Sequence, residues 1–439
     1  MSQGPSTPAA TPEAKRQLLA KLLQKKKEMP SQAPTSDAPQ LEKPTLNSGI
    51  ENLKQQHEWL DQIKQRNPYF RTLEGVPTPV VSCDGREIVN YASYNYLGLC
   101  GDKRMTQAAK DALDTYGTSV SASRIASGER HLHQQLEQKI AQFIGQEDAL
   151  VFVGGYGTNE TVISHICGPQ DLILHDSYMH RSAIEGAHSS GARRIPFPHN
   201  DLVALEGILA KHRANYRQCL IVVEGLYSMD GDIVDLEKVV RLKNRFDALL
   251  YVDEAHSLGV LGKTGKGIAE HCNVSSNEID FWMGTLSKTL ASCGGAIAAR
   301  KEIIDYLRYT TPGFVYSAGL TPANAAAALA ALSTLDVEPE RVQRIQKNSI
   351  LFQKLCIEKG FDTGLCEGYA IVPVIVGCSE KAIALSNALF AEGINVQPII
   401  YPAVPEKEAR LRFFITSEQT QTQINTTLAT LCLCLENLN

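Results

Sequence analysis

The residues best suited to chemistry lie around Lys288. Residues 280–300 read DFWMGTLSKTLASCGGAIAAR, so this lysine lies between two apolar runs that read as buried strands. An amine held in a pocket away from bulk water has a lowered pKa and can act as a nucleophile or form a Schiff base. Thr285 and Ser287 add short hydroxyls of the kind that bind phosphate. Alone, such a lysine is more often an ordinary loop residue, so the prediction of a reactive lysine depends on its neighbours.

Suitable neighbours follow other apolar runs. Asp253 and His256 lie in the segment VDEAHS, and His180 ends the segment DSYMH. Taken singly, each histidine is more often structural. A carboxylate can keep a ring nitrogen protonated, His256 can reach a phenolic oxygen on the same ring, and His180 can stack on its face. An aspartate, a Schiff-base lysine and a phosphate cradle are what a pyridoxal phosphate site requires, because the protonated ring makes that cofactor an electron sink.

The phosphate cradle is predicted from GGYGTN at residues 154–159, where glycines open a helix. Bare backbone N–H groups at a helix N-terminus can approach a phosphate. As a dinucleotide fingerprint the segment fails, because Glu160 stands where the third glycine belongs. The VDEAH segment is similar to a helicase box, but no Walker A loop lies upstream of it. Both nucleotide-binding interpretations are therefore disfavoured.

The elements that position these residues repeat as apolar run, turn and helix-length segment. Short apolar runs without alternation, separated by helical stretches, indicate a mostly parallel sheet covered on both faces. Such a sheet binds ligands at the carboxyl ends of its strands, which is where the polar segments occur. The runs are residues 149–153, 172–174, 220–223, 249–252, 281–283 and 296–299.

Composition divides the chain into four parts. Residues 1–48 predict a flexible linker with a short amphipathic helix, residues 49–110 an N-terminal segment, residues 111–320 a large domain and residues 321–439 a smaller C-terminal α/β domain. The linker is interpreted either as a disordered tail or as a tether that joins the domain to a larger assembly. Both interpretations stay open.

Charge and cysteine usage exclude several classes of function. The 439 residues carry 43 basic and 48 acidic side chains, so neither a nucleic acid nor an anionic membrane is expected as a partner. No apolar run reaches the roughly 18 residues of a membrane helix, and no signal peptide is recognisable. The eleven cysteines are scattered, with no CxxC pair for zinc. We expect a cytoplasmic protein without a metal site.

The order of seven motifs resembles that of a known family. GGYGTN, DSYMH, HND, EGLYSMDGD, VDEAHSLGVLG, GTLSK and RLR follow one another as in the α-oxoamine synthases, which are fold-type I pyridoxal phosphate enzymes. The resemblance covers the chain from about Pro68 onward, and SYNYLG and MGTLSK favour the serine palmitoyltransferase branch over the aminooxononanoate synthases. It implies an α/β fold with a large domain around a mostly parallel central sheet and a smaller C-terminal α/β domain.

The resemblance also assigns roles by motif position. Lys288 forms the Schiff base, Asp253 is the partner of the pyridinium nitrogen, His256 contacts the cofactor phenolate, and His180 stacks on the ring; these four form the predicted catalytic set. Cofactor contacts are also implied for Gly155, Tyr156, Thr285, Ser228 and Ser317, and substrate contacts for Arg412 and Asn95.

Two departures from the family pattern affect these assignments. The stretch Ser317-Ala318-Gly319 replaces a segment rich in hydroxyls that donates a phosphate ligand across the family dimer, so only Ser317 can serve. Glu129 replaces a small hydroxyl residue and is expected to alter the binding of the acyl donor.

The activity implied is a decarboxylating Claisen condensation of an amino acid with an acyl thioester, giving an α-aminoketone. The N-terminal linker resembles those of polyketide or peptide assembly lines, where an acyl carrier protein delivers the thioester in place of coenzyme A. A homodimer with a shared active site is implied. The alternatives are an aminotransferase of the same fold and a non-catalytic partner subunit; the latter is disfavoured because such partners lack the lysine. The sequence identifies neither the amino acid nor the acyl group.

Overall fold

The computed structural model describes residues 47–438 of the chain. These residues fall into two units that separate between Trp59 and Leu60. The first unit contributes most of helix α2 (Asn47–Gln62), whose side chains are largely exposed. The predicted linker and its amphipathic helix lie almost entirely outside the described residues.

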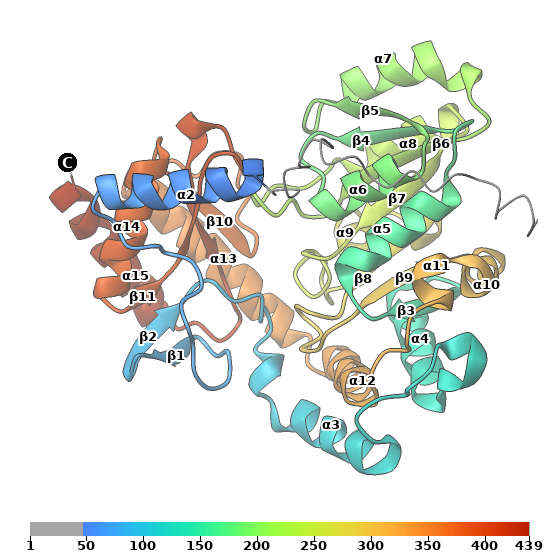
Figure 1. Cartoon of the computed structure of the whole chain (residues 1–439), viewed down its shortest axis with the longest axis horizontal. Helices are drawn as coiled ribbons and strands as arrows, with labels where there is room; N and C mark the ends of the chain where they lie inside the picture. Colours follow the sequence, from blue (N-terminus) through green and yellow to red (C-terminus); the bar gives the residue numbers. More distant parts are fainter. Residues whose placement is uncertain (1–46, 439) are drawn as a thin grey trace, which may run out of the picture. The chain divides into compact units, whose positions relative to one another are not determined.

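A seven-stranded sheet forms the centre of the second unit (Figure 1). The strand order is β3-β9-β8-β7-β6-β4-β5, and every pairing is parallel except those that β9 makes with β3 and β8. The prediction of a mostly parallel sheet is confirmed. The strands are β3 (Asp148–Phe152), β4 (Leu172–Asp176), β5 (Arg193–Phe197), β6 (Cys219–Glu224), β7 (Leu249–Asp253), β8 (Phe281–Thr285) and β9 (Gly295–Ala299).

Strand β5 was not among the predicted runs. Its sequence RRIPF carries two arginines and a proline, which do not read as a buried strand. The strand pairs only with β4, at the edge of the sheet. An edge position tolerates Pro196, because the N–H that proline lacks has no ladder partner to lose.

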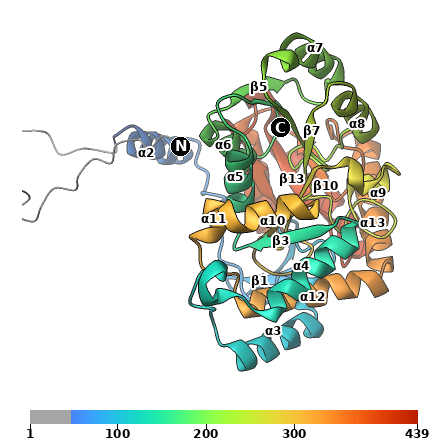
Figure 2. The same cartoon turned by 90° about the vertical axis from the view of Figure 1, so that its right-hand side faces the viewer.

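The strands send alternate side chains into two cores, as the period of two in a strand requires. Val151, Ile221 and Val252 pack in one core, whereas the preceding residues of β3 and β7 pack in the other. The first core is covered by α3 (Lys103–Tyr116), α4 (His131–Ile144), α7 (Leu202–His212), α8 (Leu236–Arg245), α9 (Ile268–His271) and α12 (Pro322–Val337). The second core is covered by α5 (Gly155–Ile166), α6 (Arg181–Ser189), α10 (Lys301–Thr310) and α11 (Pro312–Val315). Both faces of the sheet are therefore closed by helices (Figure 2).

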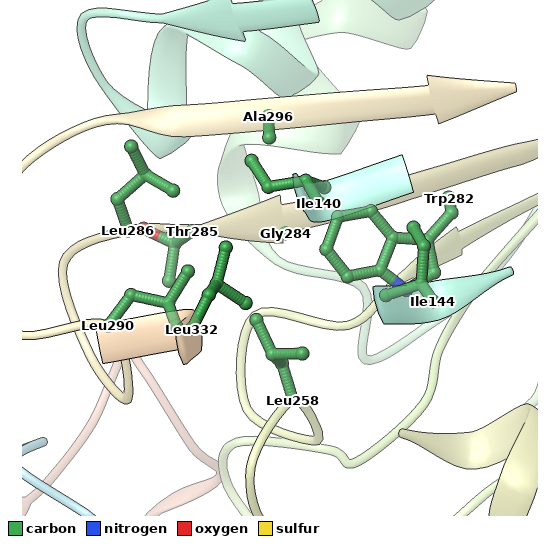
Figure 3. Close-up of a pocket in the computed structure, with 10 residues that line it drawn as sticks. All are labelled: Ile140, Ile144, Leu258, Trp282, Gly284, Thr285, Leu286, Leu290, Ala296 and Leu332. Carbon is green, nitrogen blue, oxygen red and sulfur yellow. The ribbon is translucent and has the colours of Figure 1, made fainter. Parts of the chain in front are cut away.

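The wall behind the end of β8 is apolar and close-packed. Figure 3 shows Leu258, Leu286, Leu290 and Leu332 converging on this strand end, with side chains of α4 alongside. The gap between them has no space for a water molecule. The close packing of these apolar side chains fixes the strand end that carries Thr285.

Two smaller sheets complete the second unit. One has the order β10-β13-β12, and the other joins the hairpin β1–β2 to the parallel strand β11, far along the chain (Figure 1). Their strands are β1 (Val80–Cys83), β2 (Arg86–Asn90), β10 (Ile371–Ile375), β11 (Ile394–Asn395), β12 (Gln397–Ile399) and β13 (Arg410–Phe414). The accompanying helices are α13 (Glu340–Glu358), α14 (Ser379–Ala391) and α15 (Gln421–Leu438).

The hairpin of β1 and β2 turns at Asp84-Gly85. Its φ angles are +51° and +73°, both in the left-handed region that a two-residue hairpin turn of type I′ requires. The alanine-rich helix α12 packs on α3 and α4, so its apolar face closes the core of the large sheet. The limits proposed above for the four parts of the chain stay predictions.

Within residues 47–438, no helix combines the length and the hydropathy that crossing a bilayer demands.

Candidate active site

A pocket opens at the carboxyl ends of β6, β7 and β8, beside the first turns of α5 and α6. About 370 Å³ between its walls is not filled by atoms, part of it open to solvent. The fold thus brings together residues that are more than 130 positions apart in sequence. The pocket is lined by Gly155, Tyr156, Asn159, His180, Ser182, Glu224, Asp253, Ala255, His256, Met283, Thr285 and Lys288.

Lys288 stands in the loop after β8. Burial lowers the pKa of its amine from 10.5 to about 8, although the carboxylate of Asp253 opposes the shift. Arg412 adds to the lowering, since a second positive charge disfavours a charged ammonium. The amine Nζ lies 5.6 Å from the ring centroid of Tyr94. Lys288 is therefore a lysine that is partly neutral near physiological pH, as a nucleophilic amine requires.

This pKa can be measured on the cofactor-free protein. We expect the rate at which trace acetic anhydride acetylates Lys288 to rise through pH 8, because only the neutral amine reacts. An exposed lysine would reach its midpoint near pH 10.4. Peptide mass spectrometry after competitive labelling reports both midpoints in one experiment. A midpoint for Lys288 equal to that of exposed lysines would contradict the buried environment.

Asp253 ends strand β7 and is buried. Its Oδ1 accepts the backbone N–H of Ala255 at 2.9 Å, and its Oδ2 accepts Nδ2 of Asn159 at 2.7 Å. Asn159 also accepts the hydroxyl of Tyr251 at 2.8 Å and donates to Ser182 at 2.9 Å, so its orientation is fixed. The carboxylate is held in one orientation in the pocket.

His256 is held by a tyrosine from the distant segment SYNYLG. Its Nδ1 lies 2.7 Å from the hydroxyl of Tyr96, and both side chains are buried. Burial raises the pKa of the Tyr96 phenol well above its usual value, so the phenol keeps its proton and donates it to Nδ1. Burial, Lys288 and Arg412 lower the pKa of His256, which is therefore neutral. Its single proton is on Nε2, where it can be donated to an oxygen in the pocket.

His180 caps the start of α6, and its Nδ1 bonds the hydroxyl of Ser182 at 2.7 Å. Its backbone N–H donates to Oε1 of Glu224 at 2.7 Å. Burial and the nearby charge of Asp253 raise the pKa of Glu224 well above its usual value, so this carboxyl group is protonated. Burial lowers the pKa of His180, so a neutral ring faces the pocket.

A cradle suited to phosphate lies between α5 and the end of β8. A Cβ added to Gly155 would lie 2.8 Å from Oγ1 of Thr285, so the helix can approach the strand end this closely only with glycine. Thr285 is buried, and its hydroxyl donates to the carbonyl of Gly294 at 3.1 Å. Free N–H groups of the first helical turn and the helix dipole favour an anion here. The lysine, the aspartate and this cradle together fit pyridoxal phosphate.

A methyl group in this cradle is expected to weaken the binding of the phosphate-bearing cofactor. Gly155→Ala displaces the Thr285 hydroxyl, and losing one hydrogen bond to a charged phosphate raises Kd roughly tenfold or more. Fluorescence titration of the protein with pyridoxal phosphate measures this. Gly207→Ala, on the exposed face of α7 with nothing within 4 Å of the added Cβ, is the matched control and should leave Kd unchanged. An unaltered Kd for Gly155→Ala would place the phosphate elsewhere.

Arg412 and Ser228 adjoin the pocket without lining it. Nη1 of Arg412, on β13, donates to the backbone carbonyl of Ser228 at 2.9 Å. Its guanidinium carbon lies 4.8 Å from the ring centroid of Phe414. The Nε of Arg412 is buried and has no hydrogen-bond partner among residues 47–438. The guanidinium thus keeps unused donors beside the charges of the pocket.

Asn95 and Ser317 do not line the pocket. Asn95 is buried, donates to the carbonyl of Pro77 at 2.9 Å and accepts the N–H of Cys100 at 3.1 Å, so it braces its own loop. Ser317 donates to the adjacent carbonyl of Ala318 at 3.1 Å and lines a separate small pocket. The roles predicted for both residues, in the substrate site and across a dimer, stay predictions.

The pocket also contains residues to which the sequence assigned no role. Asn159, Glu224 and Ser182 lie within or beside the motifs GGYGTN, EGLYSMDGD and DSYMH, so their positions carried a signal. Tyr96 lies in the motif SYNYLG, but its contact with His256 spans 160 residues and no local pattern indicates it. Within the described part of the chain, no cluster of three or more His, Cys, Asp or Glu is arranged to hold a metal ion.

The class of enzyme follows from this fold and pocket. The family model described as "Aminotransferase class I and II" matches residues 86–431. A mostly parallel sheet with a lysine, an aspartate and a phosphate cradle at its carboxyl edge is that of a fold-type I pyridoxal phosphate enzyme.

Similarity to individual relatives indicates the family within this class of enzymes. The serine palmitoyltransferase of Sphingobacterium spiritivorum is 38% identical over 357 residues, covering 81% of this chain and 89% of that protein. The 8-amino-7-oxononanoate synthase of Geobacter sulfurreducens is 40% identical over 374 residues, covering 84% and 95%. The solved serine palmitoyltransferase of Sphingomonas wittichii superposes with a TM-score of 0.86 at 29% identity, covering 90% of this chain and 99% of that one.

This chain belongs to the α-oxoamine synthase family. Its members are pyridoxal phosphate-dependent acyltransferases that condense an amino acid with an acyl thioester and release carbon dioxide. The resemblance inferred from the motifs is confirmed at the level of family, fold, cofactor and reaction.

Proposed function

We propose that the pocket around Lys288 carries out this condensation, with the catalytic roles on Lys288, Asp253, His256 and His180. The observation that carries the proposal is the placement of an amine with a pKa of about 8 beside a buried, fixed carboxylate. The product is an α-aminoketone with one carbon fewer than the amino acid and the acyl group together, since the amino acid carboxyl group leaves as carbon dioxide and the thioester releases its thiol.

Pyridoxal phosphate supplies an electron sink to this reaction when it is bound. Two carboxyl groups line the pocket, and burial favours the neutral form of Glu224, which leaves Asp253 as the charge partner. We therefore assign it to the positively charged ring nitrogen. The Nε2–H of His256 donates to the phenolic oxygen, and the neutral ring of His180 covers the cofactor face. Lys288 takes up and returns the substrate proton at Nζ.

The phosphate contacts are assigned to the backbone of Gly155 and Tyr156 and to the hydroxyl of Thr285, with Ser228 near the cofactor oxygen. The amino acid carboxylate is assigned to Arg412. Its unpaired, buried Nε and remaining Nη donors match the two oxygens of a carboxylate, which arginine binds through paired hydrogen bonds. Asn95 is assigned to substrate placement from its loop.

A homodimer is proposed, with Ser317 reaching the phosphate of the other subunit. Three exposed aromatic side chains within eleven residues of Ser317 in the sequence support it: Tyr306, Tyr309 and Tyr316 are 51%, 69% and 86% exposed. Exposed aromatic side chains grouped on one surface are typical of protein interfaces.

The acyl thioester is proposed to arrive on an acyl carrier protein, in the manner of a polyketide assembly line. The Pro-rich stretches and the basic amphipathic segment within residues 1–48 support a tether to such an assembly. A cytoplasmic location is proposed because all eleven cysteines are free thiols, as in a reducing compartment.

The test uses the full chain loaded with pyridoxal phosphate. Glycine, alanine, serine and arginine, each labelled in the carboxyl carbon, are supplied with an acyl-coenzyme A or the same acyl group on a carrier protein. Release of labelled carbon dioxide that requires both substrates supports the proposal. A keto acid product without carbon dioxide would mean an aminotransferase, and no turnover with any pair would reject the condensation. A higher kcat/KM with the acyl-coenzyme A than with the carrier-bound acyl group would reject only the proposed role of the carrier protein, not the condensation.

A further inference from the structure

A second cluster of titratable side chains lies next to the pocket and takes no part in the roles assigned above. His199 lies between two buried aspartates: its Nδ1 is 2.9 Å from Oδ1 of Asp176, and its Nε2 is 2.9 Å from Oδ2 of Asp232. The ring stacks on Tyr178 at 4.2 Å between centroids and meets Tyr227 edge-on at 4.5 Å. The imidazole is therefore enclosed on its faces and at both nitrogens.

This geometry determines the charge of His199. A carboxylate oxygen only accepts hydrogen bonds, so each ring nitrogen must carry a proton, and an imidazole with two protons is a cation. The alternative, a metal between the side chains, is not supported by any cluster of ligands in residues 47–438. In agreement, the two aspartates raise the pKa of His199 to about 10 against the opposing effect of burial.

Each aspartate belongs to a segment that reaches the pocket. Asp176 ends β4 and starts the turn that leads to His180, where its Oδ1 also accepts the N–H of Tyr178 at 2.8 Å. Asp232 ends a tight loop, residues 225–232, that follows β6. Within this loop the N–H of Tyr227 donates to the carbonyl of Asp232 at 2.9 Å. His199 thus joins the two loops together with its neighbour Asn200, whose N–H donates to Oδ2 of Asp176 at 2.9 Å and whose Nδ2 donates to Oδ2 of Asp232 at 2.7 Å.

The other side of loop 225–232 contacts the strand that carries Arg412. The carbonyl of Ser228 accepts Nη1 of Arg412 at 2.9 Å. Two residues further, Oδ1 of Asp230 accepts Nη1 of the buried Arg410 at 2.6 Å. Arg410 and Arg412 both stand on β13. The loop is therefore held by a histidine cation on one side and by two arginines on the other.

We propose that His199 is a positioning residue: its imidazolium fixes loop 225–232 and thereby sets the position of Arg412 for the amino acid. This inference rests on the proposed function, because the carboxylate contact of Arg412 is assigned there. His199 touches neither the cofactor pocket nor the substrate. Its loss is expected to weaken binding of the amino acid more than it slows the chemical step.

The first experiment measures the loop itself, in full-length protein without cofactor. His199→Gln has one amide donor and one carbonyl, so it can bridge to one aspartate and must repel the other. Hydrogen–deuterium exchange of the peptide that covers residues 225–232 is expected to accelerate on the order of tenfold, as the loss of a hydrogen bond to a charged group predicts. Unchanged exchange would overturn the proposal.

The matched control is His165→Gln. His165 also stacks on a tyrosine, Tyr306, and bonds a side chain, Thr310 at 2.7 Å, but both partners belong to α10 and to neither loop. This variant should leave exchange of the loop unchanged. Peptides of the paired strands β3 and β9, away from both loops, guard against simple misfolding. Their exchange should stay at the parent rate in His199→Gln while residues 225–232 accelerate, and equal acceleration of both would overturn the proposal.

The second experiment separates KM from kcat in the holoenzyme, with the amino acid that releases most carbon dioxide in the screen. His199→Gln is expected to raise KM roughly tenfold or more while changing kcat less, as displacement of a binding group predicts. Arg412→Gln is measured beside it. If Arg412→Gln raises KM and His199→Gln does not, the inference is overturned and the proposed function stands. If neither variant changes KM, the carboxylate contact itself is wrong, and the inference falls with it even if the loop exchanges faster.

Discussion

Lys288→Ala is expected to lower kcat by roughly 10³-fold or more, because it removes both the nucleophilic amine and the proton carrier. The visible absorbance band of the bound cofactor, which depends on its Schiff base with the protein, should disappear in the same variant. Cofactor affinity should fall as well, although the contacts from the phosphate cradle and Asp253 are still available in this variant. Release of carbon dioxide from a carboxyl-labelled amino acid measures kcat, and the absorbance spectrum measures attachment.

Lys263→Ala is the matched control for this prediction. Lys263 is an exposed lysine in the loop after β7 and lines no part of the pocket. Its variant should keep the spectrum and the rate of the parent protein. A visible band that persists in Lys288→Ala would show that another amine holds the cofactor, and the assignment of Lys288 would then be wrong.

Asp253→Asn is the second substitution with a large expected effect. The amide has nearly the shape of the carboxylate but no charge, so it cannot keep a ring nitrogen protonated. Its nitrogen would also face Nδ2 of Asn159, and two donors cannot bond each other. Because stabilisation of developing charge by one such group contributes strongly to catalysis, kcat should fall roughly 10²- to 10³-fold.

A cofactor-free readout accompanies this variant. The carboxylate of Asp253 raises the pKa of Lys288, so its removal should move the midpoint of Lys288 acetylation below pH 8. Asp305→Asn, on the exposed face of α10 and paired with Lys301, is the control and should change neither the midpoint nor kcat. If Asp253→Asn keeps the parent kcat, the ring nitrogen is not the partner of this carboxylate.

Much of the fold and the centre of the site could be predicted because their signals are local. The buried strands read as apolar runs, and Lys288, Asp253, His256 and His180 follow three of these runs within six residues. Their meeting at one sheet edge follows from the parallel arrangement alone.

The features of the site that the sequence did not predict depend on contacts between distant segments. The bond between Tyr96 and His256 spans 160 residues and that between Arg412 and Ser228 spans 184, and neither pair shares a local pattern. The charge of His199 likewise depends on two aspartates from different loops. Ser317 shows a different limit: no single chain can test a contact predicted to cross between subunits.

The pairing of β2 with β11 has a consequence for how this enzyme is made. Asn395 donates to Asn90 at 2.9 Å across a sequence separation of 305 residues, so the hairpin leaves the ribosome long before its partner strand exists. Arg412 follows later still. Contacts of such high sequence separation slow folding, and unpaired strand edges are prone to aggregate in the meantime. We expect yield in heterologous expression to be limited by this interval, and slower synthesis or chaperone supply to raise it.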